Sequence, residues 1–545
     1  MRTGQETRLN TILTLFAALA FAACHPLIAQ TLPVWGELEP GPHHVGYRVL
    51  YELDRSRAWR AAPDSSPSQE TARPIRISVW YPAEVSSDPT TMTLAEFVRD
   101  PAPNEYFAQL NHLLERRFIE IFSGVSQELY DTLLTLPLAA VKNAAPSAGS
   151  FPLVMYSPGG QASFPDNGVL SAYLASHGYV VASVPQLEST LEGVFQGYSR
   201  QTAVQTRDIE FAAGVMHDFP GVDRRRLAVI GYSLGGSVAL RVALHNPNVG
   251  AIVGLDASFT SATSIQTLGD SRSFDVFDLR IPILSLKAGN EESRRYDSPV
   301  TDTLRFSDRY IGYVAETVHG DFSEIKPMLI PALAHGQELE PALIQGRRGY
   351  TASCRYVVRF LDGVLKNDPA GLAFVASSSG ENGMDAGLLQ MESRPAADVP
   401  TEIELVALIR QHDHGMASQR LRLAQQTYQD LDVVRENVMN GLAYRLRANG
   451  ELDAAISLFR LNIQVHPNSI RAHDGLADAY LSNGDSLMVI RTYEQLLESL
   501  PLDTTMSQST KHRIRQNAEL RLRILRHTRP ENAGASRFPA YIYSR

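Results

Sequence analysis

The chain has 545 residues, of which 44% are hydrophobic and 20% charged, and its formal net charge at pH 7 is −9. This length suggests two or more globular domains, and the charge balance argues against a nucleic-acid-binding protein because it provides no basic footprint. The two cysteines, Cys24 and Cys354, are too few for a disulfide framework or a zinc site built on cysteines.

Residues 1–30 have the pattern of an export signal. Arg2 and Arg8 precede an apolar segment, 12–23, that is too short to span a bilayer comfortably. Small residues near the end of this segment offer a cleavage site, and Cys24 offers a lipid attachment site as an alternative. The sequence therefore predicts an exported protein, periplasmic or extracellular, that meets a membrane only if Cys24 is lipidated.

Residues 31–366 alternate between strand and helix patterns, which indicates an α/β domain with a mostly parallel sheet covered by helices on both faces. Residues 93–145 are richer in helical pattern and interrupt the strand order, so we interpret them as a helical insertion near the site, a candidate lid or cap. Strands are expected at 75–81, 151–156, 179–184, 227–230, 250–255, 281–286 and 313–318, and helices at 168–176, 206–216, 237–243 and 350–366.

Residues 367–400 combine serine, glycine and three prolines, a composition typical of a linker. From 401 to 528 the pattern is helical, and several positions recur after 34 residues, the tetratricopeptide period. We expect repeats at about 436–469 and 470–503, flanking capping helices, and a tail at 529–545. The recurring pairs are Leu442 and Leu476, Gly450 and Gly484, Phe459 and Tyr493, and Pro467 and Pro501.

The segment 231–235, Gly-Tyr-Ser-Leu-Gly, stands between an expected strand and an expected helix and fits the G-x-S-x-G nucleophile elbow. Such a turn exposes the hydroxyl of Ser233 above a helix N-terminus, which favours a developing negative charge. The motif alone is common by chance, so the interpretation as a nucleophile elbow depends on the strand before it and the helix after it. No Gly-Lys-Ser/Thr follows, which excludes a phosphate-binding P-loop.

A nucleophilic serine needs a general base, and the base needs an acid to orient it; in α/β-hydrolases the order is serine, acid, histidine. Asp256 directly follows the apolar run 251–255 and is the candidate acid. Sites in parallel sheets collect at the carboxyl ends of strands, which favours this position. Glu291 and Glu292 are the alternatives, and a capping or turn role for Asp256 stays open.

His319 is the candidate base because it follows the expected final strand at 313–318. His335 is the alternative. The oxyanion of an acyl-transfer reaction needs two backbone N–H donors, for which Leu234 and Gly160 are the candidates. Gly160 is preferred in its loop because Pro158 has no N–H, although a proline-glycine pair also marks an ordinary turn.

Several stretches resemble the plasma-type platelet-activating-factor acetylhydrolases and the broader group of dienelactone-hydrolase-like serine esterases. The resemblance spans most of residues 45–366, and it implies an acid at Asp256, on the strand before the usual one, with oxyanion donors at Gly160 and Leu234. The stretches are 79–82, 151–154 with the following Ser-x-Gly loop, 175–181, 231–236, 255–257 and His319-x-x-Phe322.

Three positions depart from those families. Pro158 and Tyr232 each stand where the resembled enzymes usually have histidine, which bears on the substrate rather than on the reaction type. Ser233 stands where dienelactone hydrolases proper have cysteine, which argues against a dienelactone substrate.

The sequence thus predicts an exported serine hydrolase that cleaves carboxylic esters through an acyl-enzyme, on short-acyl or phospholipid acetyl esters, with no metal or cofactor. The expected partner is a small-molecule ester. Three roles stay open for the repeats: binding a protein, binding a second copy of the chain, or only bracing the enzyme. Two alternatives stay open: an amidase or peptidase on the same residues, and a catalytically weak domain that serves as a scaffold.

Overall fold

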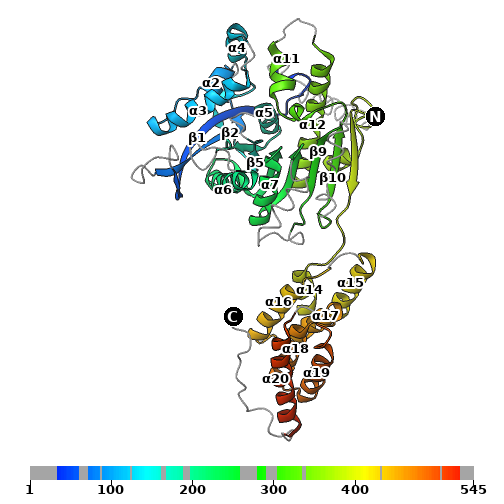
Figure 1. Cartoon of the computed structure of the whole chain (residues 1–545). Helices are drawn as coiled ribbons and strands as arrows, with labels where there is room; N and C mark the ends of the chain where they lie inside the picture. The colour runs from blue at the N-terminus through cyan, green and yellow to red at the C-terminus, as the bar shows by residue number, and fades with distance from the viewer. Residues whose placement is uncertain are drawn as a thin grey trace, which may run out of the picture. The chain divides into compact units, whose positions relative to one another are not determined.

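The computed structural model divides into two compact units, Met1–Ala396 and Ala397–Arg545, which are described separately (Figure 1). The predicted signal segment with Cys24, the alternatives Glu291, Glu292 and His335, and the predicted tail lie outside the described residues. The residues described are 33–59, 71–85, 89–122, 126–160, 167–187, 197–257, 279–289, 304–333, 339–429, 433–503 and 506–527.

A twisted sheet forms the centre of the first unit, with the strand order β11-β10-β9-β8-β7-β5-β6-β2-β1-β3 and β4 paired to β2. The six neighbouring strands β10, β9, β8, β7, β5 and β6 are parallel. At the two sides of this group, β11 pairs antiparallel with β10 and β2 pairs antiparallel with β6, and β1 pairs antiparallel with β2. Their bounds are β1 (His44–Trp59), β2 (Thr71–Glu84), β3 (Val141–Lys142), β4 (Ala145–Pro146), β5 (Phe151–Ser157), β6 (Val180–Ser183), β7 (Val222–Tyr232), β8 (Val249–Leu255), β9 (Ile283–Ala288), β10 (Arg309–Val314) and β11 (Leu389–Arg394).

Helices cover both faces of this sheet. One face packs against α5 (Gly168–Ser176) and α12 (Pro341–Leu365), the other against α6 (Tyr198–Met216) and α7 (Gly235–His245). Because side chains alternate along a strand, Ile230 of β7 belongs to the first core and its neighbour Val229 to the second. The unit has the α/β-hydrolase arrangement that the sequence predicts.

The predicted helical insertion at 93–145 contains three helices, α2 (Leu94–Val98), α3 (Glu105–Ile121) and α4 (Gln127–Leu134). Its apolar residues join the core that also contains α5 and α12. Arg117 of α3 donates a hydrogen bond of 3.1 Å to the carbonyl oxygen of Gln186, three residues beyond the end of β6. The insertion therefore contacts the segment that follows the carboxyl end of β6.

The prediction of a linker at 367–400 is wrong. This segment contains α13 (Pro369–Ala376), which packs on α12, and β11, which pairs with β10 from Arg309–Arg394 to Val314–Leu389. Its serines and glycines form a fixed turn: Ser379 is fully buried, and its hydroxyl donates to the carbonyl of Asp385 and accepts from the N–H of Leu389. The first unit therefore extends to Ala396.

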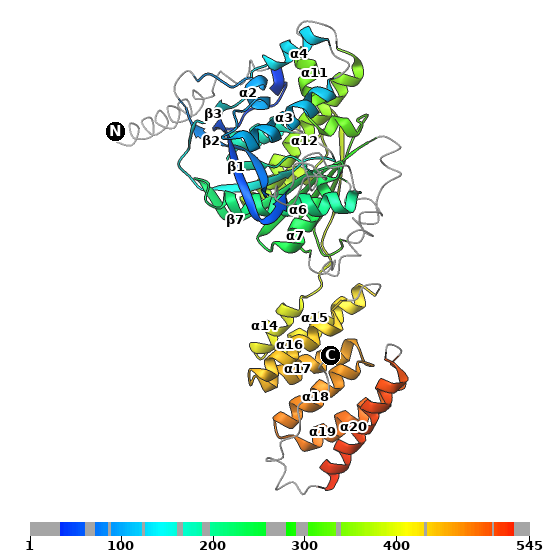
Figure 2. The same cartoon turned by 60° about the vertical axis from the view of Figure 1, so that its left-hand side comes forward.

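The second unit is entirely helical in its described residues (Figure 2). The hairpin of α16 and α17 is followed by that of α18 and α19, and the first helices begin at Glu436 and Ile470, 34 residues apart. Gly450 and Gly484 end α16 and α18 with φ values of +83° and +79°, which glycine adopts without strain. The helices are α14 (Glu402–Arg410), α15 (His414–Thr427), α16 (Glu436–Ala448), α17 (Leu452–Val465), α18 (Ile470–Ser482), α19 (Ser486–Ser499) and α20 (Gln508–His527).

Across the described parts of both units, every helix is too short or too polar to cross a membrane.

Candidate active site

Ser233 occupies a sharp turn between the end of β7 and the start of α7. Its φ is +51°, a left-handed conformation that costs a non-glycine residue about 1–2 kcal/mol. The turn requires glycine at position 231, because any other residue would bring its Cβ to 2.2 Å from the carbonyl oxygen of Gly235. The two glycines of the motif therefore have a steric function, and the predicted elbow has the predicted context of strand and helix.

The structure brings Ser233, His319 and Asp256 into one hydrogen-bonded chain. The Oγ of Ser233 lies 3.0 Å from Nε2 of His319, and Nδ1 of His319 lies 2.6 Å from Oδ2 of Asp256. With the proton on Nδ1, the imidazole donates to the carboxylate and accepts from the serine hydroxyl. The side chain of His319 is 52% exposed and that of Asp256 14%, so the base is accessible while its acid is largely enclosed.

Asp256 is held by the backbone of the neighbouring strands. It follows β8 directly, its N–H donates to the carbonyl of Leu286 at 2.7 Å, and its Oδ1 accepts from the N–H of Ala288 at 3.1 Å. The remaining oxygen, Oδ2, is thereby directed at His319. This anchoring is what a residue that orients an imidazole requires.

His319 stands further from its strand than the sequence predicts. The last parallel strand, β10, ends at Val314, so the expected strand at 313–318 is displaced, and His319 begins the short helix η6 (His319–Phe322). Buried Asp321 fixes this helix: its Oδ2 accepts from the N–H of Val318 at 2.9 Å, and its Oδ1 lies 2.8 Å from Nζ of Lys326. The base is therefore placed by its own helical turn.

The loop after β5 lies beside the elbow. A Cβ at Gly160 would stand 3.8 Å from Cβ of Leu234, and one at Gly159 would stand 3.4 Å from Cβ of Ser233. The two predicted oxyanion donors are thus brought together at the N-terminus of α7, where the helix dipole favours an anion.

A second residue of the elbow, Tyr232, contacts the base, which the sequence interpretation did not foresee. Its ring lies nearly parallel to the imidazole of His319, with 5.0 Å between centroids and 22° between planes. Its hydroxyl donates to the carbonyl of His319 at 3.2 Å. The only sequence signal was that Tyr232 departs from the resembled families.

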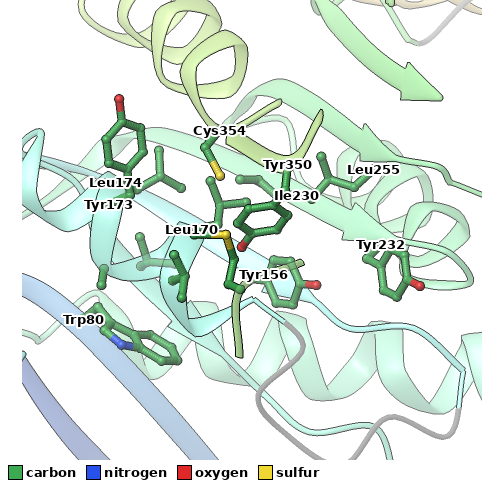
Figure 3. Close-up of a cluster of buried hydrophobic side chains, with 14 of the residues drawn as sticks. Trp80, Tyr156, Leu170, Tyr173, Leu174, Ile230, Tyr232, Leu255, Tyr350 and Cys354 are labelled. Atoms are coloured by element: carbon green, nitrogen blue, oxygen red, sulfur yellow. The ribbon is translucent and has the colours of Figure 1, made fainter. Parts of the chain in front are cut away.

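A buried polar network behind the base was also missed. The amide of Asn167 donates to the carbonyl of Phe322 and to the hydroxyl of Tyr156, and it accepts from the hydroxyl of Tyr350 at 2.9 Å. Burial raises the pKa of Tyr350 well above its ordinary value, so its hydroxyl stays a donor. Figure 3 shows Tyr156 and Tyr350 close together in the apolar cluster that also contains Cys354.

Cys354 is fully buried, and this burial raises the pKa of its thiol far above the usual range. A thiol in that state is a weak nucleophile. Within the described ranges, no three histidine, cysteine, aspartate or glutamate side chains come together as possible metal ligands.

The chain matches no model of a protein family and none of the curated proteins. Among solved structures it is similar to a ferulic acid esterase from Streptomyces cinnamoneus, with 21% identity and a TM-score of 0.44 over 64% of this chain and 96% of that chain.

Proposed function

We propose that the first unit is a serine hydrolase that cleaves carboxylic esters. The single observation that carries this proposal is the chain of contacts from Ser233 through His319 to Asp256, at 3.0 Å and 2.6 Å. Ser233 follows β7, Asp256 follows β8 and His319 begins η6, so the arrangement comes from three separate parts of the fold. A serine, a base and an acid at hydrogen-bond distances define the machinery of acyl transfer.

The proposed reaction has two halves. His319 Nε2 takes the proton of Ser233 while Oγ attacks the ester carbonyl, and the tetrahedral oxyanion accepts hydrogen bonds from the N–H groups of Leu234 and Gly160. The imidazolium then gives its proton to the leaving alkoxide, and an acyl-enzyme remains. Water attacks the acyl-enzyme with His319 again as base, which releases the carboxylic acid and restores Ser233. Asp256 stabilises the imidazolium in both halves.

The test is ester hydrolysis by the full chain and its Ser233→Ala variant, with a short p-nitrophenyl ester as substrate. We expect the variant to lose about four to six orders of magnitude in kcat, as the loss of a nucleophile does. Ser482→Ala is the control, because this exposed serine lies in the second unit and its hydroxyl donates to the carbonyl of Asp478 in its own helix. Wild-type rates in Ser233→Ala would refute the assignment.

A fluorophosphonate probe gives an independent measurement, since it reports an activated serine without a choice of substrate. Labelling of wild type and Ser482→Ala, but not of Ser233→Ala, supports the proposal. Absence of labelling in folded protein would favour a scaffold. A matched amide substrate separates an esterase from an amidase or peptidase.

The substrate class and location extend this proposal. The resemblance to acetylhydrolases favours short-acyl or phospholipid acetyl esters, and a panel of acyl lengths tests this preference. The pattern of residues 1–30 favours export, and the mass of the mature N-terminus separates simple cleavage from lipidation at Cys24. The 34-residue spacing of the hairpins favours tetratricopeptide repeats that bind a protein or a second copy.

A further inference from the structure

Tyr232 contacts both the candidate base, His319, and the loop that holds the candidate oxyanion donor Gly160. It is the last residue of β7, directly before Ser233, and only 9% of its surface is exposed. Figure 3 shows its ring at the edge of the cluster with Ile230 and Leu255, and its hydroxyl is directed away from that cluster. The ring is therefore fixed by the core on one side and faces the site on the other.

The contact with His319 has two separate parts. The ring covers the imidazole at 5.0 Å and 22°, and the hydroxyl donates to the backbone carbonyl of His319 at 3.2 Å. One contact restrains the side chain of the base and the other its main chain. An aromatic ring in this position also favours a neighbouring cation, because its face carries negative charge.

The same ring contacts the loop that holds Gly160. A Cβ at Gly159 would lie 3.1 Å from Cδ1 and from Cε1 of Tyr232, which is closer than side chains normally approach. The backbone of Gly159 therefore packs directly against the ring. A displacement of the ring would therefore alter its contacts with both His319 and this loop.

We propose that Tyr232 is a positioning residue that holds the imidazole of His319 in register with Ser233 and ties it to the loop of Gly159 and Gly160. The inference rests on the proposed function, in which His319 carries a proton between Ser233 and the leaving group. Stacking limits rotation of the imidazole during this transfer, and misplacement of about 1 Å in such a group costs about 100-fold in rate.

Two substitutions separate the ring from the hydroxyl. Tyr232→Phe keeps the stack and loses one hydrogen bond, so we expect kcat to fall about 2- to 10-fold. Tyr232→Leu removes the stack, and we expect kcat to fall about 10- to 100-fold with KM within about 2-fold of wild type. Tyr81→Phe is the matched control, since buried Tyr81 also donates to a backbone carbonyl, that of Ala144, in another part of the sheet.

A structural readout makes the inference independent of turnover. The stacked ring shifts the NMR signal of the His319 imidazole Cε1–H, which is assigned by its loss in His319→Gln. We expect this shift to persist in Tyr232→Phe and to vanish in Tyr232→Leu. An unchanged signal in Tyr232→Leu overturns the positioning role, whether or not the chain hydrolyses esters.

The kinetic outcomes are equally decisive. Tyr232→Leu with full kcat, or with a raised KM and unchanged kcat, overturns the inference, because the latter pattern marks a substrate contact. Failure of the proposed function looks different: wild type is then inactive and Ser233 is not labelled, while the His319 signal still reports whether the ring holds the imidazole. Should Tyr232→Leu not fold, Tyr232→Phe compared with Tyr81→Phe still tests the hydroxyl.

Discussion

Gly235 lies so close to Ser157 that a Cβ on the glycine would stand 2.1 Å from the serine's carbonyl oxygen. The contact joins the first turn of α7 to the end of β5, and the obstructing atom belongs to the backbone, which cannot rotate away. The first turn of α7 and the end of β5 are thus packed too closely to admit a side chain at Gly235.

Gly235→Ala should therefore damage both stability and labelling of Ser233. Overpacking of a close contact costs about 1–3 kcal/mol, and the relief of this clash must displace the N-terminus of α7. We expect a lower urea midpoint by tryptophan fluorescence and a loss of fluorophosphonate labelling of at least about 10-fold.

Gly214→Ala is the control for this prediction. Gly214 lies inside α6, and a Cβ there would meet no heavy atom within 4 Å. Alanine in a helix interior is about 0.5–1 kcal/mol more favourable than glycine, so this variant should be as stable as wild type or more so. Equal midpoints and labelling for wild type and both variants would show that the elbow is not under the constraint described.

Asp256→Asn tests the identity of the acid. An amide carries no charge to stabilise the imidazolium, and its N–H group competes for the position of Oδ2 beside Nδ1 of His319. We expect kcat for a p-nitrophenyl ester to fall about 10³- to 10⁴-fold with little change in KM. Near-normal turnover in Asp256→Asn, together with a large loss in Glu291→Gln or Glu292→Gln, would move the acid to those alternatives.

The sequence placed Ser233 and Asp256 at strand ends because both positions depend on local signals. An apolar run followed by Gly-x-Ser-x-Gly or by aspartate marks a strand end, and β7 and β8 end at Tyr232 and Leu255. β11 was missed because it is a short edge strand of six residues, only one of them buried, so its composition resembles that of a linker.

Two of the long-range contacts around His319 left no trace in the sequence. Tyr232 and His319 are 87 residues apart, and neither residue type signals a stack with the other. Asn167 and Phe322 are separated by 155 residues, and their hydrogen bond depends on how α5 and η6 meet. Such pairings are set by the three-dimensional packing of the whole sheet, which local patterns do not encode.

Breaking a buried ion-pair cluster should destabilise the first unit. Asp208 of α6 is fully buried and lies 2.6 Å from Arg73 of β2 and 2.7 Å from Arg57 of β1. Asp208→Ala removes the carboxylate that Arg73 contacts and leaves Arg57 with Asp54, 2.6 Å from its Nε, so we expect a loss of about 3–5 kcal/mol in the free energy of unfolding from the broken buried pair.

The guanidinium carbon of Arg73 lies 4.5 Å from the centroid of the Trp59 ring. Tryptophan fluorescence is therefore a suitable probe of this loss of stability. Asp218→Ala is the matched control, since Asp218 forms an exposed pair with Arg224. Exposed pairs contribute about 0–1 kcal/mol. Similar losses in Asp208→Ala and Asp218→Ala would contradict the importance of burial.

Asp474 should contribute less to the stability of the second unit as pH rises from about 4 to about 6. Burial and the nearby charge of Asp478 raise the pKa of Asp474, on α18, to about 6, against an ordinary value of 3.8. A carboxyl with a raised pKa in the folded state favours the protonated form, so the folded unit binds more protons than the unfolded chain within this window. By linkage, the contribution of Asp474 to stability is complete below pH 4 and lost as pH passes 6.

Asp474→Asn removes this contribution, because its amide cannot ionise. We expect the variant to unfold at higher urea than wild type at pH 7 and at a similar concentration at pH 4, measured by far-ultraviolet circular dichroism of the full chain. Burial lowers the pKa of neighbouring His473, which acts in the opposite direction but cancels in the comparison of the two proteins.

The two units can be followed separately in that experiment. All three tryptophans, Trp35, Trp59 and Trp80, belong to the first unit, so their fluorescence reports its unfolding while the dichroism also reports the helices of the second. The higher urea midpoint expected for Asp474→Asn at pH 7 should appear in the dichroism and not in the tryptophan fluorescence. A difference between wild type and Asp474→Asn that is the same at pH 4 and pH 7 would show that Asp474 does not titrate between them, and that its effect on the helices comes from shape rather than charge.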